Sequence, residues 1–253
     1  MQKKLTMLYF SPTGNTLRAA QYLAAGVAEQ IEQIDLSLPQ QNGSTYGEDA
    51  LVLLAAPVFG GRLPALFLDR LAHFSGRNAR AITVVVYGNR AYEDALLELN
   101  DAAAARGFQV VASAALLAEH SMVREVAAGR PDRQDKIQMH SFALQIIEKL
   151  KNGPNSTPDV PGNRPYKQWQ KMPAVPLASP ACIRCGLCAK RCPAGAIPAG
   201  QPNETNPQRC ILCMRCVALC PQNARALPPQ AEEAIRAKLA PVADIRRENE
   251  LFL

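Results

Sequence analysis

Apolar runs and amphipathic stretches alternate along the first 150 residues of the chain. Five short apolar runs are typical of strands, and four longer stretches between or after them are typical of helices. Near-continuous apolar strands separated by helices indicate a parallel sheet that is covered on both faces. The pattern predicts an α/β fold with a doubly wound, five-stranded parallel sheet. The expected strands are 5–10, 31–36, 51–56, 81–87 and 109–117, and the expected helices are 16–28, 64–74, 92–106 and 133–150.

The composition changes after this predicted domain, 1–150. Ten of the 20 prolines fall between Pro154 and Pro202, which excludes long regular elements there. Residues 151–179 are therefore predicted to be a linker or wrapping arm, and Trp169 indicates that this arm packs on a domain surface. All eight cysteines lie between 182 and 220, so a small domain is expected at 180–228. The tail, 229–253, is expected to form a short helix and an anchoring segment.

Length and composition restrict the class of protein. With 253 residues, 48% of them hydrophobic, the chain can form a full α/β domain and a small extra module. Because it has no apolar run of roughly 18 residues and no signal-peptide pattern, we expect a cytoplasmic protein without membrane contact. The formal charge of +6 is scattered without a basic stripe that contains aromatics, so no nucleic-acid partner is expected.

Two cysteine runs repeat at a spacing of 28 residues, and each has the pattern Cys-x2-Cys-x2-Cys-x3-Cys-Pro. In a reducing compartment, such crowding argues for metal binding instead of disulfides. Zinc is one alternative, because CxxC pairs bind zinc, but a four-ligand zinc site gives no reason for the third regular cysteine. The spacing favours 4Fe–4S clusters, since a two-residue gap lets successive thiolates surround one cluster.

The cysteine pattern closely resembles that of the bacterial two-cluster ferredoxins. The resemblance implies a small α+β domain with two 4Fe–4S clusters, in which the fourth cysteine of each run binds the other cluster. Two adjacent clusters form a path for single electrons. The implied ligands are Cys182, Cys185, Cys188 and Cys220 for one cluster, and Cys210, Cys213, Cys216 and Cys192 for the other.

The hexapeptide SPTGNT, residues 11–16, links the first predicted strand to the first helix. This position offers backbone N–H groups and a positive helix end to an anion, and Gly14 permits close backbone approach. The absence of a lysine excludes a Walker A motif, and a simple helix cap would explain only one of the side-chain donors. The loop closely resembles the phosphate loop of flavodoxins, which implies bound FMN with its phosphate at Ser11, Thr13, Gly14, Asn15, Thr16 and Leu17.

Two further loops, 57–64 and 87–92, also resemble flavodoxin loops, which enclose the flavin ring. The resemblance implies that Phe59 covers one face of the ring and Tyr92 the other, with Gly60 and Gly61 near flavin N5. The alternative is that both aromatics are ordinary core residues. The residues implied to bind the ring are Pro57, Val58, Phe59, Gly60, Gly61, Tyr87, Gly88, Asn89, Arg90 and Tyr92.

Positive charges in these loops depart from the flavodoxin pattern, in which the surroundings of the ring are commonly acidic. If Arg62 and Arg90 point at the flavin, they stabilise its anionic reduced form and raise its potential; the alternative is that both are solvated. After the fifth strand, His120, Ser121 and Arg130 either line a pocket beside the ring or contact the cysteine domain. None of them is assigned a catalytic role.

Over nearly its whole length the chain resembles the bacterial and archaeal flavodoxin–ferredoxin fusion proteins. This resemblance implies an electron-transfer protein, because a flavin exchanges one or two electrons whereas each cluster passes one, and fusion raises the effective concentration of the two modules. A redox partner protein is then expected. The alternative is an FMN-dependent reductase of a small molecule such as a quinone, an enone or a nitro compound. An iron–sulfur sensor has little support, since no DNA-binding segment is evident.

Overall fold

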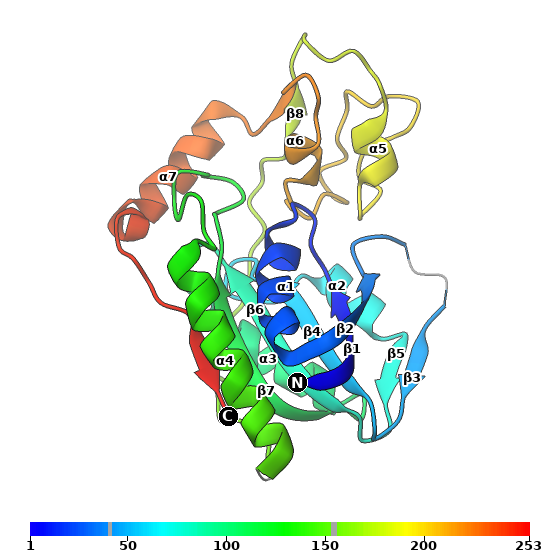
Figure 1. Cartoon of the computed structure of the whole chain (residues 1–253). Helices are drawn as coiled ribbons and strands as arrows, with labels where there is room; N and C mark the ends of the chain where they lie inside the picture. The colour runs from blue at the N-terminus through cyan, green and yellow to red at the C-terminus, as the bar shows by residue number, and fades with distance from the viewer. Residues whose placement is uncertain (40–41, 153–155) are drawn as a thin grey trace.

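The fold is described from a computed structural model, which describes residues 1–39, 42–152 and 156–253. A sheet domain carries the cysteine-containing module at one of its ends (Figure 1). Residues 153–155 of the predicted linker lie outside the described residues. In the part of the chain that is described, no helix is long and apolar enough to cross a membrane.

A six-stranded sheet forms the centre of the larger domain. The five predicted parallel strands are confirmed, and their spatial order, β2-β1-β4-β6-β7, is the flavodoxin-like 2-1-3-4-5 order of a doubly wound sheet. A sixth strand that was not predicted, β10 (Glu250–Phe252), pairs antiparallel with β7 and extends the five parallel strands at this edge. The parallel strands are β1 (Gln2–Tyr9), β2 (Ala28–Asp35), β4 (Leu51–Pro57), β6 (Arg80–Tyr87) and β7 (Gln109–Leu117).

Helices cover both faces of the sheet, because neighbouring residues of each buried strand are apolar on opposite sides. On one face, α1 (Asn15–Val27) and α4 (Arg133–Asn152) pack against Leu5 and Met7 of β1. On the other face, α2 (Ala65–Leu71) and α3 (Ala95–Ala104) pack against Leu8 of the same strand. All four helices were predicted, although α2 and α3 are shorter than expected at both ends.

A separate two-stranded parallel sheet was not predicted. It consists of β3 (Ser44–Tyr46) and β5 (Phe74–Gly76), and it lies away from the end of the domain that carries the cysteine module (Figure 1). Tyr46 packs on Phe108, with ring centroids 6.2 Å apart. Strands of three residues are too short for a period-two pattern to be recognised.

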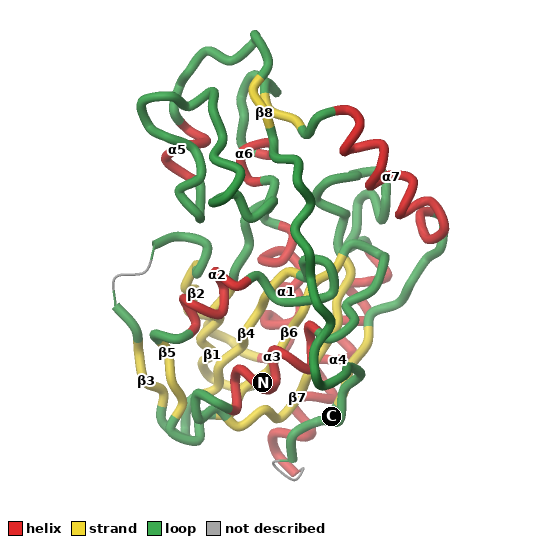
Figure 2. The backbone as a smooth tube through the Cα atoms, turned by 180° about the vertical axis from the view of Figure 1, so that it is seen from behind, coloured by secondary structure: helices red, strands yellow, loops and turns green. Residues whose placement is uncertain are grey.

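After α4, the chain runs along the sheet domain toward the cysteine module (Figure 2). Asp94, which precedes α3, accepts hydrogen bonds from the backbone N–H groups of Asn163 (2.8 Å) and Lys167 (2.6 Å). Trp169 is 40% exposed and lies against Gly60, where an added Cβ would come within 2.1 Å of the indole ring. The arm therefore packs on the sheet domain and reaches the loop after β4.

The cysteine module is a small α+β unit. β8 (Leu177–Ala178) pairs antiparallel with β9 (Arg225–Ala226), and two short helices, α5 (Leu187–Arg191) and α6 (Arg215–Ala218), lie between them in sequence. From this module α7 (Pro229–Ala243) leads back to β10 at the edge of the main sheet. The small apolar core of the module consists of Val175, Leu212, Met214 and Leu227.

Side chains from both parts fix the module on the sheet domain. Arg70 of α2 donates a hydrogen bond to the backbone oxygen of Pro193 (2.6 Å). Arg215 of α6 donates another to the hydroxyl of Ser37, which follows β2 (2.8 Å). The buried Leu239 of α7 adds an apolar contact with the loop after β7. The module is thus held at several points around the end of the sheet.

Candidate functional site

The eight cysteines are free thiols that surround two cavities in the module. Each cavity is lined by the first three cysteines of one run and by the fourth cysteine of the other run. This crossed membership is the one that the ferredoxin resemblance implies. We call the cavity lined by Cys182, Cys185, Cys188 and Cys220 the outer cavity, and the cavity lined by Cys192, Cys210, Cys213 and Cys216 the inner cavity.

The loops that carry the cysteines bend at equivalent positions, 28 residues apart. Arg184 (φ 54°) and Gly186 (φ 75°) have left-handed backbone in the outer loop, and Leu212 (φ 58°) and Met214 (φ 61°) have it in the inner loop. For residues with a Cβ, such a conformation costs about 1–3 kcal/mol and is typical of functional sites. The bends place three cysteines of each run around a common cavity.

The cysteines of the inner cavity are strongly desolvated. Burial raises the pKa of Cys213 to about 12 and that of Cys216 to about 11. Because thiolates are the ligands of iron, these thiols need the positive charge of a metal centre to ionise. Within the described ranges, no three His, Cys, Asp or Glu side chains could hold a single metal ion. In a cube-shaped cluster each thiolate binds a different iron, so widely spaced sulfurs around a cavity fit such a group.

A third cavity lies at the carboxyl ends of the parallel strands, where doubly wound sheets bind ligands. The loops after β1, β4, β6 and β7 line it, and so does Cys213 of the inner cavity. We call it the sheet-edge cavity. Ten of the sixteen residues predicted to bind FMN come together there: Thr13, Asn15, Thr16, Pro57, Val58, Phe59, Gly60, Tyr87, Gly88 and Arg90.

The predicted phosphate loop forms one side of this cavity. Gly14 has a φ of 90° directly before α1, a conformation that favours glycine. The Oγ of Ser11 accepts a hydrogen bond from the backbone N–H of Leu17 (2.9 Å), which fixes its position at the first turn of α1. Leu17 packs with the core. Thr13 and Thr16 line the cavity, whereas the phosphate contacts of Ser11 and Leu17 remain predictions.

The first ring loop is a tight turn. Backbone hydrogen bonds join Phe59 and Arg62 in both directions (2.9 and 3.2 Å), and Gly60 (φ 62°) and Gly61 (φ 90°) occupy the two central positions. A hairpin turn with positive φ at both central residues requires glycine or a similarly permissive residue. Phe59 and Gly60 line the cavity. A Cβ at Gly61 would come within 1.7 Å of Glu93, and the place of Gly61 near flavin N5 remains a prediction.

The second ring loop turns two predicted residues away from the cavity. Tyr92 is buried, packs edge-on against Tyr87 with ring centroids 5.4 Å apart, and donates a hydrogen bond to Glu250 (3.0 Å). Asn89 donates from Nδ2 to two backbone oxygens of the C-terminal segment, at 2.7 and 2.8 Å. The prediction that Tyr92 covers a ring face is wrong, because the aromatic is a core residue, and Asn89 does not line the cavity either.

The two arginines of the ring loops differ in their surroundings. Arg62 points away from the cavity, binds Glu98 through two hydrogen bonds (2.7 and 2.9 Å) and lies over the ring of Tyr166. Arg62 therefore takes neither of the two alternatives, a place at the flavin or a solvated side chain, because Glu98 binds its guanidinium. Arg90 lines the cavity, but its guanidinium is paired with Glu93 (2.8 Å), which offsets part of its positive charge.

His120 lines the cavity and was not selected as a site residue. Its Nδ1 accepts hydrogen bonds from the backbone N–H groups of Met122 (3.3 Å) and Val123 (3.1 Å). Backbone N–H groups only donate, so the ring is neutral with its proton on Nε2. Burial, and to a smaller extent Arg90, lowers the pKa of His120 to about 4. Its place directly after a parallel strand is the signal that could have selected it, together with Glu119 and Ser121.

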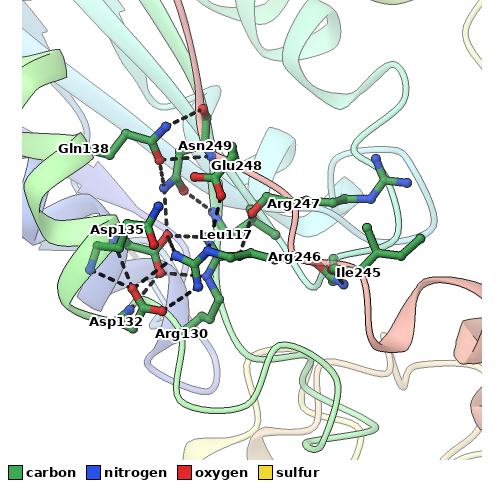
Figure 3. A network of polar contacts seen from close by, with 12 residues as sticks. Leu117, Arg130, Asp132, Asp135, Gln138, Ile245, Arg246, Arg247, Glu248 and Asn249 are labelled. Atoms are coloured by element: carbon green, nitrogen blue, oxygen red, sulfur yellow. Dashed lines mark hydrogen bonds and ion pairs between the residues drawn. The ribbon is translucent and has the colours of Figure 1, made fainter.

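The C-terminal segment holds these loops in place (Figure 3). Asn249 accepts a hydrogen bond from the backbone N–H of Leu117 (2.8 Å) and donates to Asp135 (2.9 Å) and Gln138 (2.7 Å). Asp135 also forms a buried ion pair with Arg130. Arg130 therefore lies in this network and not in the cavity, which gives it a structural role.

Comparison with known proteins identifies the cysteine module. A family model for a 4Fe-4S dicluster domain matches residues 181–225. One component of an ion-translocating oxidoreductase complex from Methanosarcina acetivorans is 48% identical over 44 residues, which make up 17% of this chain and 17% of that protein. The chain thus spans about one sixth of the length of this relative. The family match decides between zinc and iron–sulfur clusters in favour of the clusters.

Solved structures resemble the sheet domain only distantly. Rubredoxin oxygen:oxidoreductase from Desulfovibrio gigas aligns with 59% of this chain and 37% of its own, at 15% identity and a TM-score of 0.42. A flavodoxin of Streptococcus pneumonia TIGR4 aligns with 58% of this chain and 99% of its own, at 14% identity and a TM-score of 0.40. The strand order itself assigns the fold. The chain is thus a fusion of a flavodoxin-like α/β domain with a 4Fe-4S dicluster ferredoxin domain.

Proposed function

We propose that the chain is an electron-transfer protein that holds 4Fe–4S clusters in the outer and inner cavities and FMN in the sheet-edge cavity. The observation that carries this proposal is the position of Cys213, which lines both the inner cavity and the sheet-edge cavity. When bound, the clusters supply single-electron transfer, and FMN supplies both one-electron and two-electron chemistry. A shared lining residue supports direct electron exchange between the two kinds of centre.

Residues of the sheet-edge cavity suit FMN in chemistry as well as in place. Thr13 and Thr16 offer hydroxyl donors beside the positive end of α1, as a phosphate requires. Phe59 offers an aromatic side chain for contact with the ring, and Gly60 beside it also lines the cavity. The pairing of Arg90 with Glu93 limits the positive charge that the ring meets.

Cofactor analysis after anaerobic purification tests the proposal. We expect about eight iron atoms and one FMN per chain, as two clusters and one flavin require. We also expect the flavin to become reduced when the clusters are reduced with dithionite. Zinc in place of iron, or a chain that binds no FMN, contradicts the proposal.

The position of His120 favours a second function, the FMN-dependent reduction of a small molecule. Its Nε2–H has no hydrogen-bond partner among the described residues, so the ring can donate to an acceptor in the sheet-edge cavity. Reduction of a quinone, an enone or a nitro compound by the loaded protein tests this function. If His120→Gln lowers kcat/KM for such an acceptor but leaves electron transfer from the clusters to FMN unchanged, the second function is supported. Equal rates in both proteins contradict it.

A further inference from the structure

The rim of the outer cavity is exposed to solvent, unlike that of the inner cavity. Ile183, between two of its cysteines, is 63% exposed, and Cys185 is exposed as well. The equivalent residue of the inner loop, Ile211, packs against the core of the sheet domain. The outer cavity is therefore the point at which the cysteines of the module are most accessible from outside.

Positive charge predominates in the module that contains this exposed point. Residues 180–228 contain six Arg or Lys and a single acidic residue, Glu204. Two of the six are engaged by hydrogen bonds of 2.8 Å: Arg225 binds Thr205 inside the module, and Arg215 binds Ser37 of the sheet domain. The others are exposed, and three of them belong to the outer loop and to α5, which follows it: Arg184, Lys190 and Arg191.

These three cations are not neutralised by the chain itself. In the described ranges, none of their side chains forms an ion pair, whereas Arg124 of the loop after β7 and Arg246 of the tail are each paired with a carboxylate. Protein interfaces commonly have an apolar core and a polar rim, and their charges complement those of the partner. Unpaired cations beside the apolar Ile183 therefore fit a partner with an acidic surface.

We propose that Ile183, Arg184, Cys185, Lys190 and Arg191, here called the outer rim, form the docking surface for a small acidic one-electron carrier protein. This inference rests on the proposed function, because it assumes a cluster in the outer cavity. One electron leaves the reduced carrier and reduces that cluster by one electron. No bond forms or breaks, and no proton is needed, so the step is balanced.

Electrostatic steering is the physical reason for the charges. Complementary charge raises the rate of encounter between two proteins by factors of 10 or more, and salt weakens this effect. A second copy of this chain would bring the same positive rim, so self-association at this face is unfavourable. A nucleic acid would bind the cations through its phosphates, but the phosphates would make no favourable contact with the apolar side chain of Ile183.

Stopped-flow reduction of the loaded protein by a reduced acidic two-cluster ferredoxin tests the proposal. The variant is Lys190→Glu/Arg191→Glu, which avoids the left-handed position of Arg184. Its matched control is Arg133→Glu, an exposed cation of α4 on the sheet domain. We expect the second-order rate of the double variant to fall by about tenfold at low salt. The control is expected to react like the parent protein.

Salt and a small reductant complete the experiment. Raising the salt from about 0.02 to about 0.5 M is expected to slow the parent protein toward the rate of the double variant. Dithionite is expected to reduce both proteins at equal rates, which shows that the outer cluster is intact. Equal rates with the ferredoxin, or a parallel fall with dithionite, overturn the proposal. So does tighter binding of a DNA duplex than of the ferredoxin.

The proposed function fails in a different way. If the clusters and FMN are bound and dithionite reduces them, but the rate with the ferredoxin is independent of the rim charges, the docking surface is wrong and the electron-transfer function stands. If the purified protein lacks clusters, both proposals are wrong. Iron analysis of every variant therefore precedes the kinetic measurements.

Discussion

The outer and inner cysteine loops have the same cysteine spacing and the same backbone bends but opposite surroundings. At the first bend the outer loop has Arg184, which is exposed, and the inner loop has Leu212, which is buried in the core of the module. At the second bend, Gly186 corresponds to the buried Met214. The cysteines define what each loop binds, and the residues between them define what each loop faces.

The comparison gives the two cavities separate roles. The inner loop packs against the sheet domain, since Ile211 contacts its core and Cys213 lines the sheet-edge cavity. The outer loop has the equivalent Ile183 in solvent. Under the proposed function, the inner loop would exchange electrons within the chain and the outer loop would exchange them with the proposed partner. Four measurements test this division, from the largest expected effect to the smallest.

Loss of a cysteine on each side is the most severe test. Cys213→Ser and Cys185→Ser are each expected to lose one cluster, about four of the eight irons. FMN fluorescence is expected to rise several-fold in Cys213→Ser only, because an adjacent cluster quenches the flavin and the outer cluster is farther away. Iron analysis and fluorescence of the purified variants check this. Equal fluorescence in the two variants would contradict the separate roles.

An exchange of the bend residues tests the packing. Leu212→Arg places an unpaired cation in the apolar core of the module, which is expected to lower the free energy of unfolding by about 3–5 kcal/mol. The reverse change in the outer loop, Arg184→Leu, is the control and is expected to change it by less than about 0.5 kcal/mol. Denaturant unfolding of both loaded proteins measures the difference, and similar losses would refute the comparison.

Protonation of His120 tests the side of the module that faces the sheet domain. His120 lines the sheet-edge cavity together with Cys213, Arg90 and Glu119. The pKa of His120 is lowered to about 4 from 6.5, so between these values the unfolded chain binds more protons than the folded chain. Stability is therefore expected to fall as the pH decreases from 6.5 to 4, with a slope of up to about 1.4 kcal/mol per pH unit. In His120→Gln this contribution to the slope should disappear. An unchanged slope means that His120 is not held neutral.

The C-terminal segment provides the smallest expected effect. Asn249→Ala leaves the buried backbone N–H of Leu117 without its acceptor and is expected to cost about 1–3 kcal/mol of unfolding free energy. The FMN affinity is expected to fall with it, because the same segment holds Asn89 of the second ring loop. Asn152→Ala, at an exposed side chain of α4, is the control. Thermal unfolding and FMN titration measure both effects.

Local patterns explain why much of the site could be predicted. The strands depend on patterns within a few residues, and the structure has the parallel strands that these patterns indicate. The crossed cysteine membership follows from the ferredoxin resemblance, and the structure has it as well. The predicted phosphate loop rests on donors that are consecutive in the sequence, and two of them, Thr13 and Thr16, line the sheet-edge cavity.

Contacts between distant residues explain the errors. Arg62 turns away from the cavity because Glu98, 36 positions later, binds it. Tyr92 is buried because Glu250, from the other end of the chain, accepts its hydrogen bond. The three-residue strand β10 carries no recognisable pattern of its own and depends on the exposed edge of β7. None of these partners could be read from the sequence near the residue concerned.

The return of the chain to the main sheet determines how the module can move. The arm connects the sheet domain to the N-terminal end of the module, and α7 and β10 connect the C-terminal end of the module back to the sheet. A module attached at one end can rotate about its linker, whereas one attached at both ends keeps its separation from the sheet. Under the proposed function, electron exchange across Cys213 would need no search for a productive orientation, and its rate is expected to be insensitive to the viscosity of the solvent.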